Sequence, residues 1–428
     1  MHNLKKLNLF IFLFLFIAFF GQLKAQDTLR VMQYNLLNYG KDVYSCDQQT
    51  NNRDDKNGYL KILFSHYLPD IFTVNEMNGD EADVKYLLDN ALNADGRTQY
   101  VQAEYSGSYL INMLYYNANK LALKWQGRLV LGSNERDANF YRLYYKSPDL
   151  ADGADTVFIN YVVVHLKAGS EASDISTRTT ETKNIMAELE QMGWNGNVIF
   201  SGDCNLYNSD EQAFQNLIAP SNTSYSFYDP LGREGNWHSN LTFADIHTQS
   251  THSASGCASG GGMDDRFDFI LVQEDLLNNT NNLSYKEGSY EAIGQDGQHF
   301  NKSLLDGANS DYPADLVNAL YNNSDHLPVT MQLIVDQTTT GINDIADIGV
   351  RLLGNPVSGI IKLEVQAQLP KFGYQLFSIS GNTVKSGVVY PSRGTTVSIP
   401  TGKLPAGIYL LKLKMANRAP VTFKVILQ

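Results

Sequence analysis

Cysteine is scarce in this chain, which has only Cys46, Cys204 and Cys257 among its 428 residues. So few thiols exclude a small disulfide-rich scaffold, whose fold depends on several bridges. Cys204 follows an apolar run and is expected to be a buried thiol. Cys46 and Cys257 lie in polar, loop-like stretches, where they either pair or stay free. Their pairing is a hypothesis that alkylation without reductant tests.

Long hydrophobic runs are absent beyond the first residues. Leu7–Phe20 is an apolar run interrupted only by Asn8, preceded by Lys5 and Lys6 and followed by a small-residue cleavage point at Ala25. This pattern predicts a secretory signal peptide over residues 1–25. The alternative, a membrane anchor, would need about 20 apolar residues. We therefore expect export through the inner membrane to the surface or the medium, without stable membrane insertion.

Positive charge is sparse in most of the chain. Residues 26–345 contain 20 Lys/Arg and 43 Asp/Glu, a net charge of −23, whereas residues 346–428 contain ten and two, a net charge of +8. The larger part lacks the basic footprint of a protein that binds DNA tightly without sequence preference. This counts against a DNA-storage or repressor role. It counts less against a metal-dependent hydrolase, because a bound cation reverses the charge locally.

Short β-rich runs alternate with helical stretches from Thr28 to Val335. Clustered strands with few helices between them are typical of a two-sheet sandwich with helices outside, so residues 26–335 are predicted to form one α+β domain. Residues 336–345 have the composition of a linker. Beyond it, residues 346–428 alternate short strands with Gly/Pro/Asn turns, which predicts a small all-β sandwich. The Ser/Gly-rich stretch Ala254–Gly262 is predicted to be a surface loop.

Polar residues follow apolar, β-rich runs at several distant places. These are Tyr34-Asn35, Asn75-Glu76, Ser201-Gly202-Asp203-Cys204-Asn205 and Ser324-Asp325-His326-Leu327-Pro328, with His165 after Val162–Val164. Each string alone is ordinary, since a strand-end histidine is usually structural and Gly-Asp-x-Asn is usually a turn. Together they predict one site that cleaves a phosphodiester, which needs a positioned water, a stabilised transition state and a proton donor.

Oxygen ligands in these strings predict a metal site. Mg²⁺ is usually held by one or two carboxylates together with substrate phosphate, and Glu76 is the predicted ligand. Asn35 can hold a phosphate oxygen or a metal-bound water without adding charge. Asp325 would point away from its neighbour His326 on a strand, which favours a role at the metal or the water.

Two histidines are the acid/base candidates. His165 and His326 adjoin apolar strands, and only histidine titrates near neutrality without help. Asp268 lies inside the apolar run Phe267–Val272, where an acid is costly unless it is paired. We expect His326 to be its partner.

Residues 28–335 resemble the endonuclease/exonuclease/phosphatase superfamily, the deoxyribonuclease I-like fold. The resemblance is carried by Asn35 in Met32-Gln33-Tyr34-Asn35, Glu76, His165 in Val164-His165-Leu166-Lys167, Asp203 and Asn205 in Gly202-Asp203-Cys204-Asn205, Asp268, and Asp325-His326 before Leu327-Pro328-Val329. It implies a four-layer α/β/β/α sandwich on two mixed sheets. It also implies attack of water on phosphorus assisted by Mg²⁺, with Mn²⁺ and Ca²⁺ as alternatives.

The resemblance also implies roles for single residues. Glu76 and Asn35 serve the metal, Asp203 and Asn205 orient the water and bind the transition state, His165 and His326 act as general acid/base and phosphate-binding groups, Asp268 orients His326, and Asp325 is a further metal or water contact. Weaker matches are Glu104 as partner of His165 and Arg136 as a phosphate-binding arginine, for which Arg142 competes. Asn75 stands where the family usually has glutamine.

Residues 350–428 resemble the C-terminal sorting domain of the type IX secretion pathway. The resemblance is carried by Asn355-Pro356-Val357-Ser358-Gly359, Ser380-Gly381 and Leu404-Pro405-Ala406-Gly407-Ile408-Tyr409-Leu410-Leu411-Lys412. It implies recognition by the outer-membrane secretion machinery and removal of the domain as an option. A generic adhesive β-module is the alternative.

The sequence thus predicts an exported, metal-dependent phosphodiesterase. We expect a monomeric nuclease that acts on DNA or RNA, with the type IX machinery as its partner during export. Hydrolysis of sphingomyelin or inositol phosphates is the alternative within the superfamily, with Tyr225–Tyr228 and Trp237 as candidates for a lipid-binding aromatic loop. A catalytically inactive surface-binding protein is the alternative of another class.

Overall fold

The computed structural model describes residues 26–336, except 108, 133–135, 148, 149, 151–155 and 222, and residues 350–428, except 366–368 and 416–420. The predicted signal peptide and residues 337–345 of the predicted linker lie outside the described residues. Among the helices that are described, none has the length and apolar character needed to cross a bilayer.

Two sheets face each other in the larger part of the chain. The first has the strand order β11-β13-β1-β2-β4-β3, with β12 beside β13. Its strands are β1 (Gln26–Tyr39), β2 (Ile71–Asn78), β3 (Tyr100–Gln102), β4 (Leu110–Asn117), β11 (Leu283–Tyr285), β12 (Glu291–Ala292) and β13 (Val329–Asp336). The second sheet has the order β5-β6-β7-β8-β10-β9. Its strands are β5 (Leu121–Val130), β6 (Asp137–Tyr145), β7 (Phe158–His165), β8 (Val198–Asp203), β9 (Phe227–Tyr228) and β10 (Asp268–Gln273).

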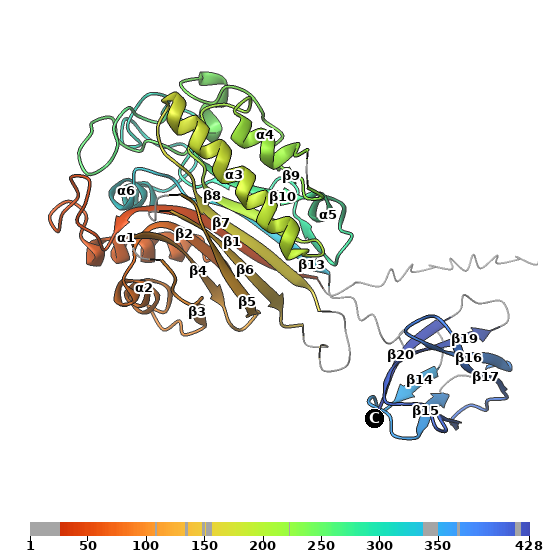
Figure 1. Cartoon of the computed structure of the whole chain (residues 1–428). Helices are drawn as coiled ribbons and strands as arrows, with labels where there is room; N and C mark the ends of the chain where they lie inside the picture. Colours follow the sequence, from red (N-terminus) through yellow and green to blue (C-terminus); the bar gives the residue numbers. More distant parts are fainter. Residues whose placement is uncertain are drawn as a thin grey trace, which may run out of the picture.

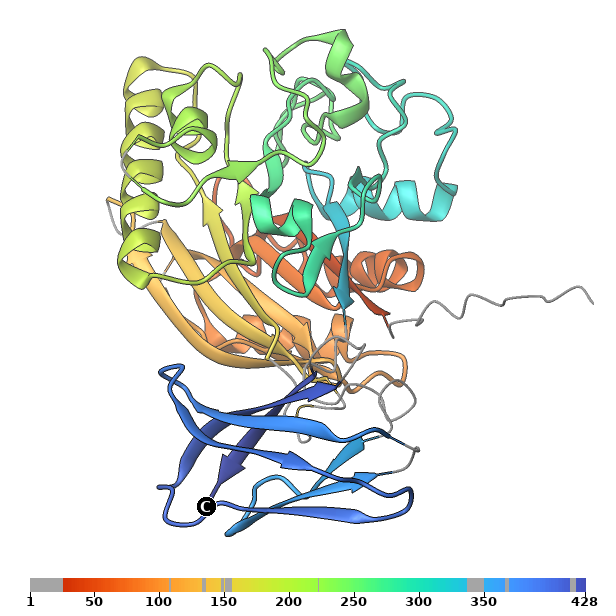
Figure 2. The same ribbon diagram turned by 90° about the vertical axis from the view of Figure 1, so that its right-hand side faces the viewer.

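Helices cover both outer faces of this pair of sheets. They are α1 (Arg53–His66), α2 (Glu81–Leu87), the π-helix η1 (Leu88–Leu92), α3 (Ala172–Met192), α4 (Gln212–Ile218), the 3₁₀ helix η3 (Leu241–Ile246), α5 (Glu274–Asn278) and α6 (Ala314–Asn323). Figure 1 shows α1, α2 and α6 on the side of the first sheet and α3 and α4 on the side of the second. Figure 2, turned by 90°, shows the same arrangement of helices outside the two sheets. The predicted four-layer α/β/β/α sandwich is confirmed.

Two parallel strand pairs explain where the long helices lie. β1 pairs with β2 and β7 pairs with β8 in parallel, and each such pair requires a crossover, which α1 and α3 supply. Helix α1 begins at Asn52, whose side chain accepts the N–H groups of Asp54 and Asp55. Helix α3 begins with a capping box between Glu171 and Asp174. The parallel pairs make the ends of β2, β7 and β8 point to one edge of the sandwich.

Strand β7 shows why the second sheet is apolar on both faces. Tyr161 and Val163 belong to the core between the sheets, whereas Val162 and Val164 pack under α3 and α4. A strand that is buried on both sides has no polar alternation, which accounts for the unbroken apolar run before His165.

A buried polar network ties the two sheets together close to this edge. Asn75 of β2 donates to the carbonyl of Val164 at 2.9 Å, and its Oδ1 accepts the N–H of Asp203 at 2.9 Å. The Oγ atoms of Thr73 and Ser201 lie 3.3 Å apart. Satisfied buried polar groups fix a unique alignment, so this network sets the position of β8 against β2. Asn75 is fully buried, and its side chain serves this network.

Gly202 is required by the close approach of β7 and β8. Its φ is +149°, and an added Cβ would lie 1.8 Å from the carbonyl oxygen of Val164. No other residue fits there, which explains the glycine of the Gly-Asp-x-Asn string.

The C-terminal part has two small antiparallel sheets with a core of its own. Their orders are β14-β15-β18 and β17-β16-β19-β20. The strands are β14 (Val350–Leu353), β15 (Ile360–Val365), β16 (Phe372–Ser378), β17 (Thr383–Val389), β18 (Thr396–Pro400), β19 (Gly407–Met415) and β20 (Val421–Leu427). Inward residues from both sheets, such as Ile361, Leu411 and Phe423, form this core. The predicted all-β sandwich is confirmed.

Candidate active site

One pocket lies where strands of both sheets end. It has a volume of about 410 Å³, and its lining includes Glu76, Arg136, His165, Asp203, Asn205, Asp325 and His326. Asn35 of β1 and Asp268 of β10 lie directly against these residues, with hydrogen bonds to Asp203 and His326. The structure thus brings together every predicted site residue except Glu104.

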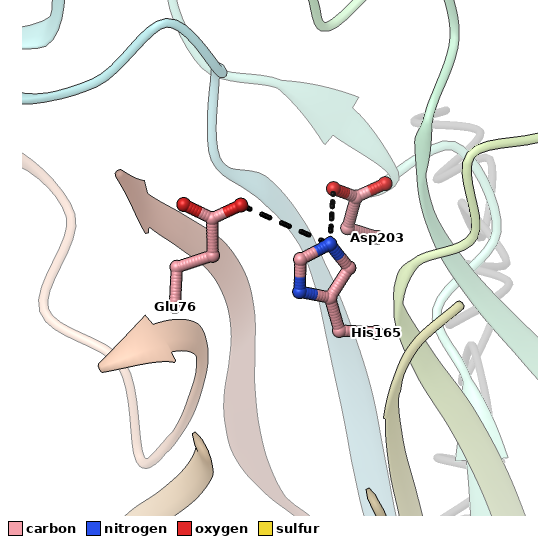
Figure 3. Close-up of side chains that lie close together, drawn as sticks. All are labelled: Glu76, His165 and Asp203. Carbon is pink, nitrogen blue, oxygen red and sulfur yellow. Dashed lines mark ion pairs between the residues drawn. The ribbon is translucent and has the colours of Figure 1, made fainter. Parts of the chain in front are cut away.

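Glu76, His165 and Asp203 all line the pocket, and their side chains lie close together (Figure 3). Nε2 of His165 lies 3.4 Å from Oδ2 of Asp203 and 3.8 Å from Oε1 of Glu76. One ligand atom from each residue lies within 4.8 Å of the other two. Because metal–oxygen distances are about 2.0–2.6 Å, the three groups have the spacing of ligands around one cation.

Glu76 is held by a distorted backbone. Its φ is +57°, unusual for a residue with a Cβ, and the register of β2 against β4 shifts between Val74 and Met77. Such a bulge re-aims a side chain. Oε2 accepts the N–H of Asn38 at 3.1 Å, and Oε1 accepts Nδ2 of Asn35 at 3.2 Å. The distortion is the local reason why the carboxylate faces the pocket.

Asp203 is fixed by amides on three sides. Its Oδ2 accepts Nδ2 of Asn35 at 3.0 Å, and its Oδ1 accepts the N–H of Asn205 at 3.1 Å. Its own N–H is held by Asn75, as described above. Asn205, with φ +50°, donates from Nδ2 to the carbonyl of Leu166 at 3.1 Å. The carboxylate is therefore preorganised before any substrate arrives.

The two central carboxylates carry more negative charge than their surroundings compensate. Burial raises the pKa of Glu76, and the nearby Asp325 adds to the effect. Burial raises the pKa of Asp203 to about 7, although His326 opposes the shift; Asp268 and Glu76 act in the same direction as burial. A bound cation would relieve this repulsion and return both groups to the charged form.

His165 is neutral in this environment. Burial lowers its pKa well below the usual value, and the positive charges of Arg136 and His326 lower it further. A neutral imidazole beside two carboxylates is a donor set that divalent cations accept. The residues present therefore fit a divalent cation, and its identity stays a prediction.

His326 and Asp268 form a buried pair. Nδ1 of the ring lies 2.7 Å from Oδ2 of Asp268, as the sequence predicted. Burial alone would lower the pKa of His326, but Asp268 and Asp203 outweigh it and hold the pKa well above its usual value. The ring is thus a cation whose Nε2 side faces the pocket, 3.7 Å from Oδ2 of Asp203.

Gln249 contacts the same histidine and was missed by the sequence analysis. Its Nε2 lies 2.7 Å from Nε2 of His326 and 3.5 Å from Oδ2 of Asp325. A neutral ring accepts this N–H, whereas a protonated ring needs the amide turned to present its oxygen. Nothing in the irregular sequence around Gln249 marks it, because its position depends on a long loop.

Glu104 is not part of the pocket. Its side chain is exposed, and its backbone N–H and carbonyl bond the side chain of Gln126. His165 instead faces Glu76 and Asp203. The predicted pairing of Glu104 with His165 is wrong, because the ring is turned toward β2 and β8 and away from the segment after β3.

The two competing arginines lie at different places. Arg136 lines the pocket and donates from Nη1 to the carbonyl of Leu166. Arg142 lines a separate groove next to Trp125 and Phe158. Only Arg136 is placed to meet a phosphate in the pocket.

Cys46 and Cys257, whose pairing the sequence left open, form a disulfide. It joins the segment after β1 to the Ser/Gly-rich loop, and Tyr44, Cys257 and Ser259 line the pocket. Cys204 is a buried free thiol, as expected. The bridge therefore closes one side of the pocket with two segments that are far apart in sequence.

A residue next to each half of the bridge holds a carboxylate of the site: Asn38, at the end of β1, also donates from Nδ2 to Sγ of Cys46 at 3.4 Å, and Ser259 lies two residues after Cys257. The N–H of Asn38 donates to Glu76, and the N–H of Ser259 donates to Oδ2 of Asp325 at 2.9 Å. Hydrogen-bond partners of this kind orient ligands, and their loss typically costs about 10–100-fold in metal affinity. The disulfide thus fixes two donors around the predicted cation.

Replacing Cys46 and Cys257 by serine is expected to raise the Mg²⁺ concentration for half-maximal activity by about 10-fold. Reductant should have the same effect on the wild-type protein and no further effect on the double variant, whose remaining thiol, Cys204, is buried. Magnesium titrations below the melting temperature of each protein measure this. Equal half-saturation in oxidised, reduced and variant protein would contradict it.

Comparisons with known proteins agree with the two-part organisation. Residues 354–428 match the family model described as the secretion system C-terminal sorting domain, which confirms the resemblance of that part. No curated protein sequence matches the chain.

Several solved structures are similar to the chain. D. rerio TDP2 complexed with a single-strand DNA product is 15% identical, with 72% of this chain and 98% of that chain covered and a TM-score of 0.47. The human Nocturnin catalytic domain with bound sulfate is 15% identical, with 72% and 97% covered and a TM-score of 0.46. An endonuclease/exonuclease/phosphatase from Beutenbergia cavernae DSM 12333 is 14% identical, with 93% and 99% covered and a TM-score of 0.37.

Proposed function

We propose that this protein is an exported, divalent-metal-dependent phosphodiesterase that hydrolyses DNA or RNA. The observation that supports this most directly is the convergence of Glu76, His165, Asp203 and His326 on one 410 Å³ pocket. Strand ends from both sheets contribute these groups, so their meeting is a property of the fold. An inactive binding protein would have no reason to keep a carboxylate, an amide and a histidine set preorganised around one point.

The residues of the pocket divide the chemistry between them. A divalent cation held by Glu76 and its neighbours would supply positive charge for the phosphate oxygens. The cation would keep Asp203 charged, and a charged carboxylate beside it is suited to accept the proton of the attacking water. The cationic His326 is placed to stabilise charge on the phosphoryl oxygens or to protonate the leaving oxygen. Asn35 and Asn205 hold Asp203 in place.

Burial of most of the candidate lipid-binding aromatics favours nucleic acid over sphingomyelin. Trp237 and Phe227 are fully buried and Tyr225 is 4% exposed, so Tyr228, at 39% exposed, is the one ring of this set that is open to a bilayer. Tyr44 on the rim of the pocket is 64% exposed, which leaves a ring free to stack on a base. These observations support the nuclease over the lipid hydrolase.

The test is a substrate panel with the purified full chain. Plasmid DNA, RNA, a single-stranded oligonucleotide, sphingomyelin and bis-p-nitrophenyl phosphate are incubated with Mg²⁺ and with chelator. We expect metal-dependent cleavage of the nucleic acids and of bis-p-nitrophenyl phosphate. Cleavage of sphingomyelin alone would overturn the nuclease assignment, and no cleavage of any substrate would overturn the enzyme assignment.

Removing residues 346–428 is expected to leave turnover within about 2-fold of the full chain and to abolish delivery to the cell surface or medium. The two parts have separate hydrophobic cores. Among the described residues from 350 onward, none lines the catalytic pocket. Activity assays on purified proteins and immunoblots of the producing cells' fractions measure the two effects. Normal delivery of the truncated chain would contradict the sorting role.

A further inference from the structure

A second groove lies on the outer face of the second sheet, away from the pocket. It has a volume of about 450 Å³ and is lined by Lys124, Trp125, Arg142, Phe158, Met192 and Trp194. These residues come from β5, β6, the start of β7 and the end of α3 with the residues that follow it. The groove thus lies at the end of β7 opposite to His165, which ends the strand in the catalytic pocket. At about 3.3 Å per residue, the eight residues of β7 place the two sites roughly 25 Å apart.

The local backbone fixes the position of the Trp125 side chain. The register of β5 against β6 shifts between Leu123 and Trp125, a bulge that re-aims the side chain. A Cβ on Gly127 would lie 2.4 Å from the indole, so the ring lies over a position that only glycine leaves open. Trp194 meets it edge-on at 5.8 Å and is itself 8% exposed. Trp125 nevertheless remains 44% exposed, so the supported ring is open to solvent.

Unneutralised positive charge lies beside this ring. The guanidinium of Arg142 stacks 4.0 Å above Phe158, and its Nε is buried without a hydrogen-bond partner. Within the described residues, Arg142 has neither an ion pair nor a hydrogen bond from its guanidinium, and Lys124 is exposed. An arginine without a carboxylate is unexpected in a region of net charge −23. An anionic group of a bound molecule would neutralise the charge of Arg142 and satisfy its guanidinium.

We propose that this groove is a second binding site for single-stranded nucleic acid, in which a base stacks on Trp125 and a backbone phosphate meets Arg142 and Lys124. Aromatic platforms beside cations are how proteins hold single strands without sequence preference. The proposal rests on the proposed function, because it assigns the groove to a distant segment of the same polymeric substrate. A strand long enough to reach both the groove and the pocket would bind more tightly than a short one. The enzyme is therefore expected to prefer long single strands.

The binding test uses the full chain without metal, so that nothing is cleaved. A single-stranded 30-mer is titrated while tryptophan fluorescence and anisotropy of a labelled strand are recorded. Trp125→Ala and Arg142→Gln are each expected to weaken binding by about 5–150-fold, the range of one stacked base. Trp125→Phe should restore most of the affinity. Arg128→Gln is the charge-matched control. Arg128 lies on β5, the strand of Trp125, and is already paired with Asp137.

Turnover separates this proposal from the function of the pocket. Trp125→Ala should raise KM for the 30-mer and leave kcat and bis-p-nitrophenyl phosphate hydrolysis unchanged. Wild-type affinity in both Trp125→Ala and Arg142→Gln would overturn the second site even if the pocket is active. Equally tight binding of heparin, which lacks bases, would overturn the stacking and assign the groove to anionic polysaccharide. Loss of all hydrolysis in wild-type protein would overturn the proposed function, while the metal-free titration would still decide whether the groove binds the strand.

Discussion

Replacing His326 by alanine is expected to lower kcat on bis-p-nitrophenyl phosphate by about 10²–10⁴-fold, the usual contribution of a positioned acid or base. The ring is the protonated group of the pocket, held by Asp268 at 2.7 Å and directed toward Asp203. Its removal takes away both the proton donor and the positive charge. The expected loss is in kcat more than in KM, because the interaction strengthens as charge develops on phosphorus.

The same substitution leaves the carboxylate of Asp268 buried without its partner, which destabilises the protein. The double variant His326→Ala, Asp268→Asn removes this charge and separates the two effects. We expect it to melt closer to the wild type and to remain inactive. His66→Ala, an exposed histidine on α1, is the matched control and should keep full activity. Near-normal kcat in the double variant would contradict the role of His326.

Replacing Glu76 by glutamine is expected to raise the Mg²⁺ concentration for half-maximal activity by at least about 10–100-fold, since even partners of ligands contribute that much. Glutamine keeps the size of the side chain and removes the charge that lies 3.8 Å from His165. The effect should appear in the magnesium titration and, without substrate, in calorimetric metal binding.

Glu104→Gln is the matched control for this variant. The family resemblance implied Glu104 as the partner of His165, but the structure places Glu104 on the surface. We expect its magnesium titration to overlay that of the wild type. An unchanged titration in Glu76→Gln, or a shift in Glu104→Gln, would show that the metal site is not built as the pocket indicates.

The sequence predicted most of the sandwich because strand and helix signals are local. The apolar run before His165 reads as a strand buried on both faces, and the acid in Asp268-Phe269-Ile270 needs a partner wherever it lies. Strands and helices alternate along residues 28–335, as the sequence predicts, and strands β7 and β8 end at the polar residues His165 and Asp203. Short elements such as β9, β11 and β12 were missed, because two or three residues carry no periodicity.

Contacts between distant segments could not be predicted in the same way. Gln249 reaches His326 from an irregular loop, and Ser259 holds Asp325 from a Ser/Gly-rich one. Neither residue type is distinctive, and loop paths are set by tertiary packing. Arg142 looked equivalent to Arg136 in sequence, yet the alternation of β6 places it on the outer face of the sheet.

The sequence by itself determined which chemical groups end the central strands, because side-chain type and strand alternation are properties of neighbouring residues. Only the tertiary structure decided that Glu76, His165 and Asp203 lie close enough to hold one cation. It also decided that a disulfide lies beside the N–H donors of Asn38 and Ser259, and that Glu104 lies outside the pocket. The physical reason is that these relations depend on how two sheets are registered by buried amides such as Asn75. Those bonds join residues 89 and 128 positions apart, and no local pattern encodes them.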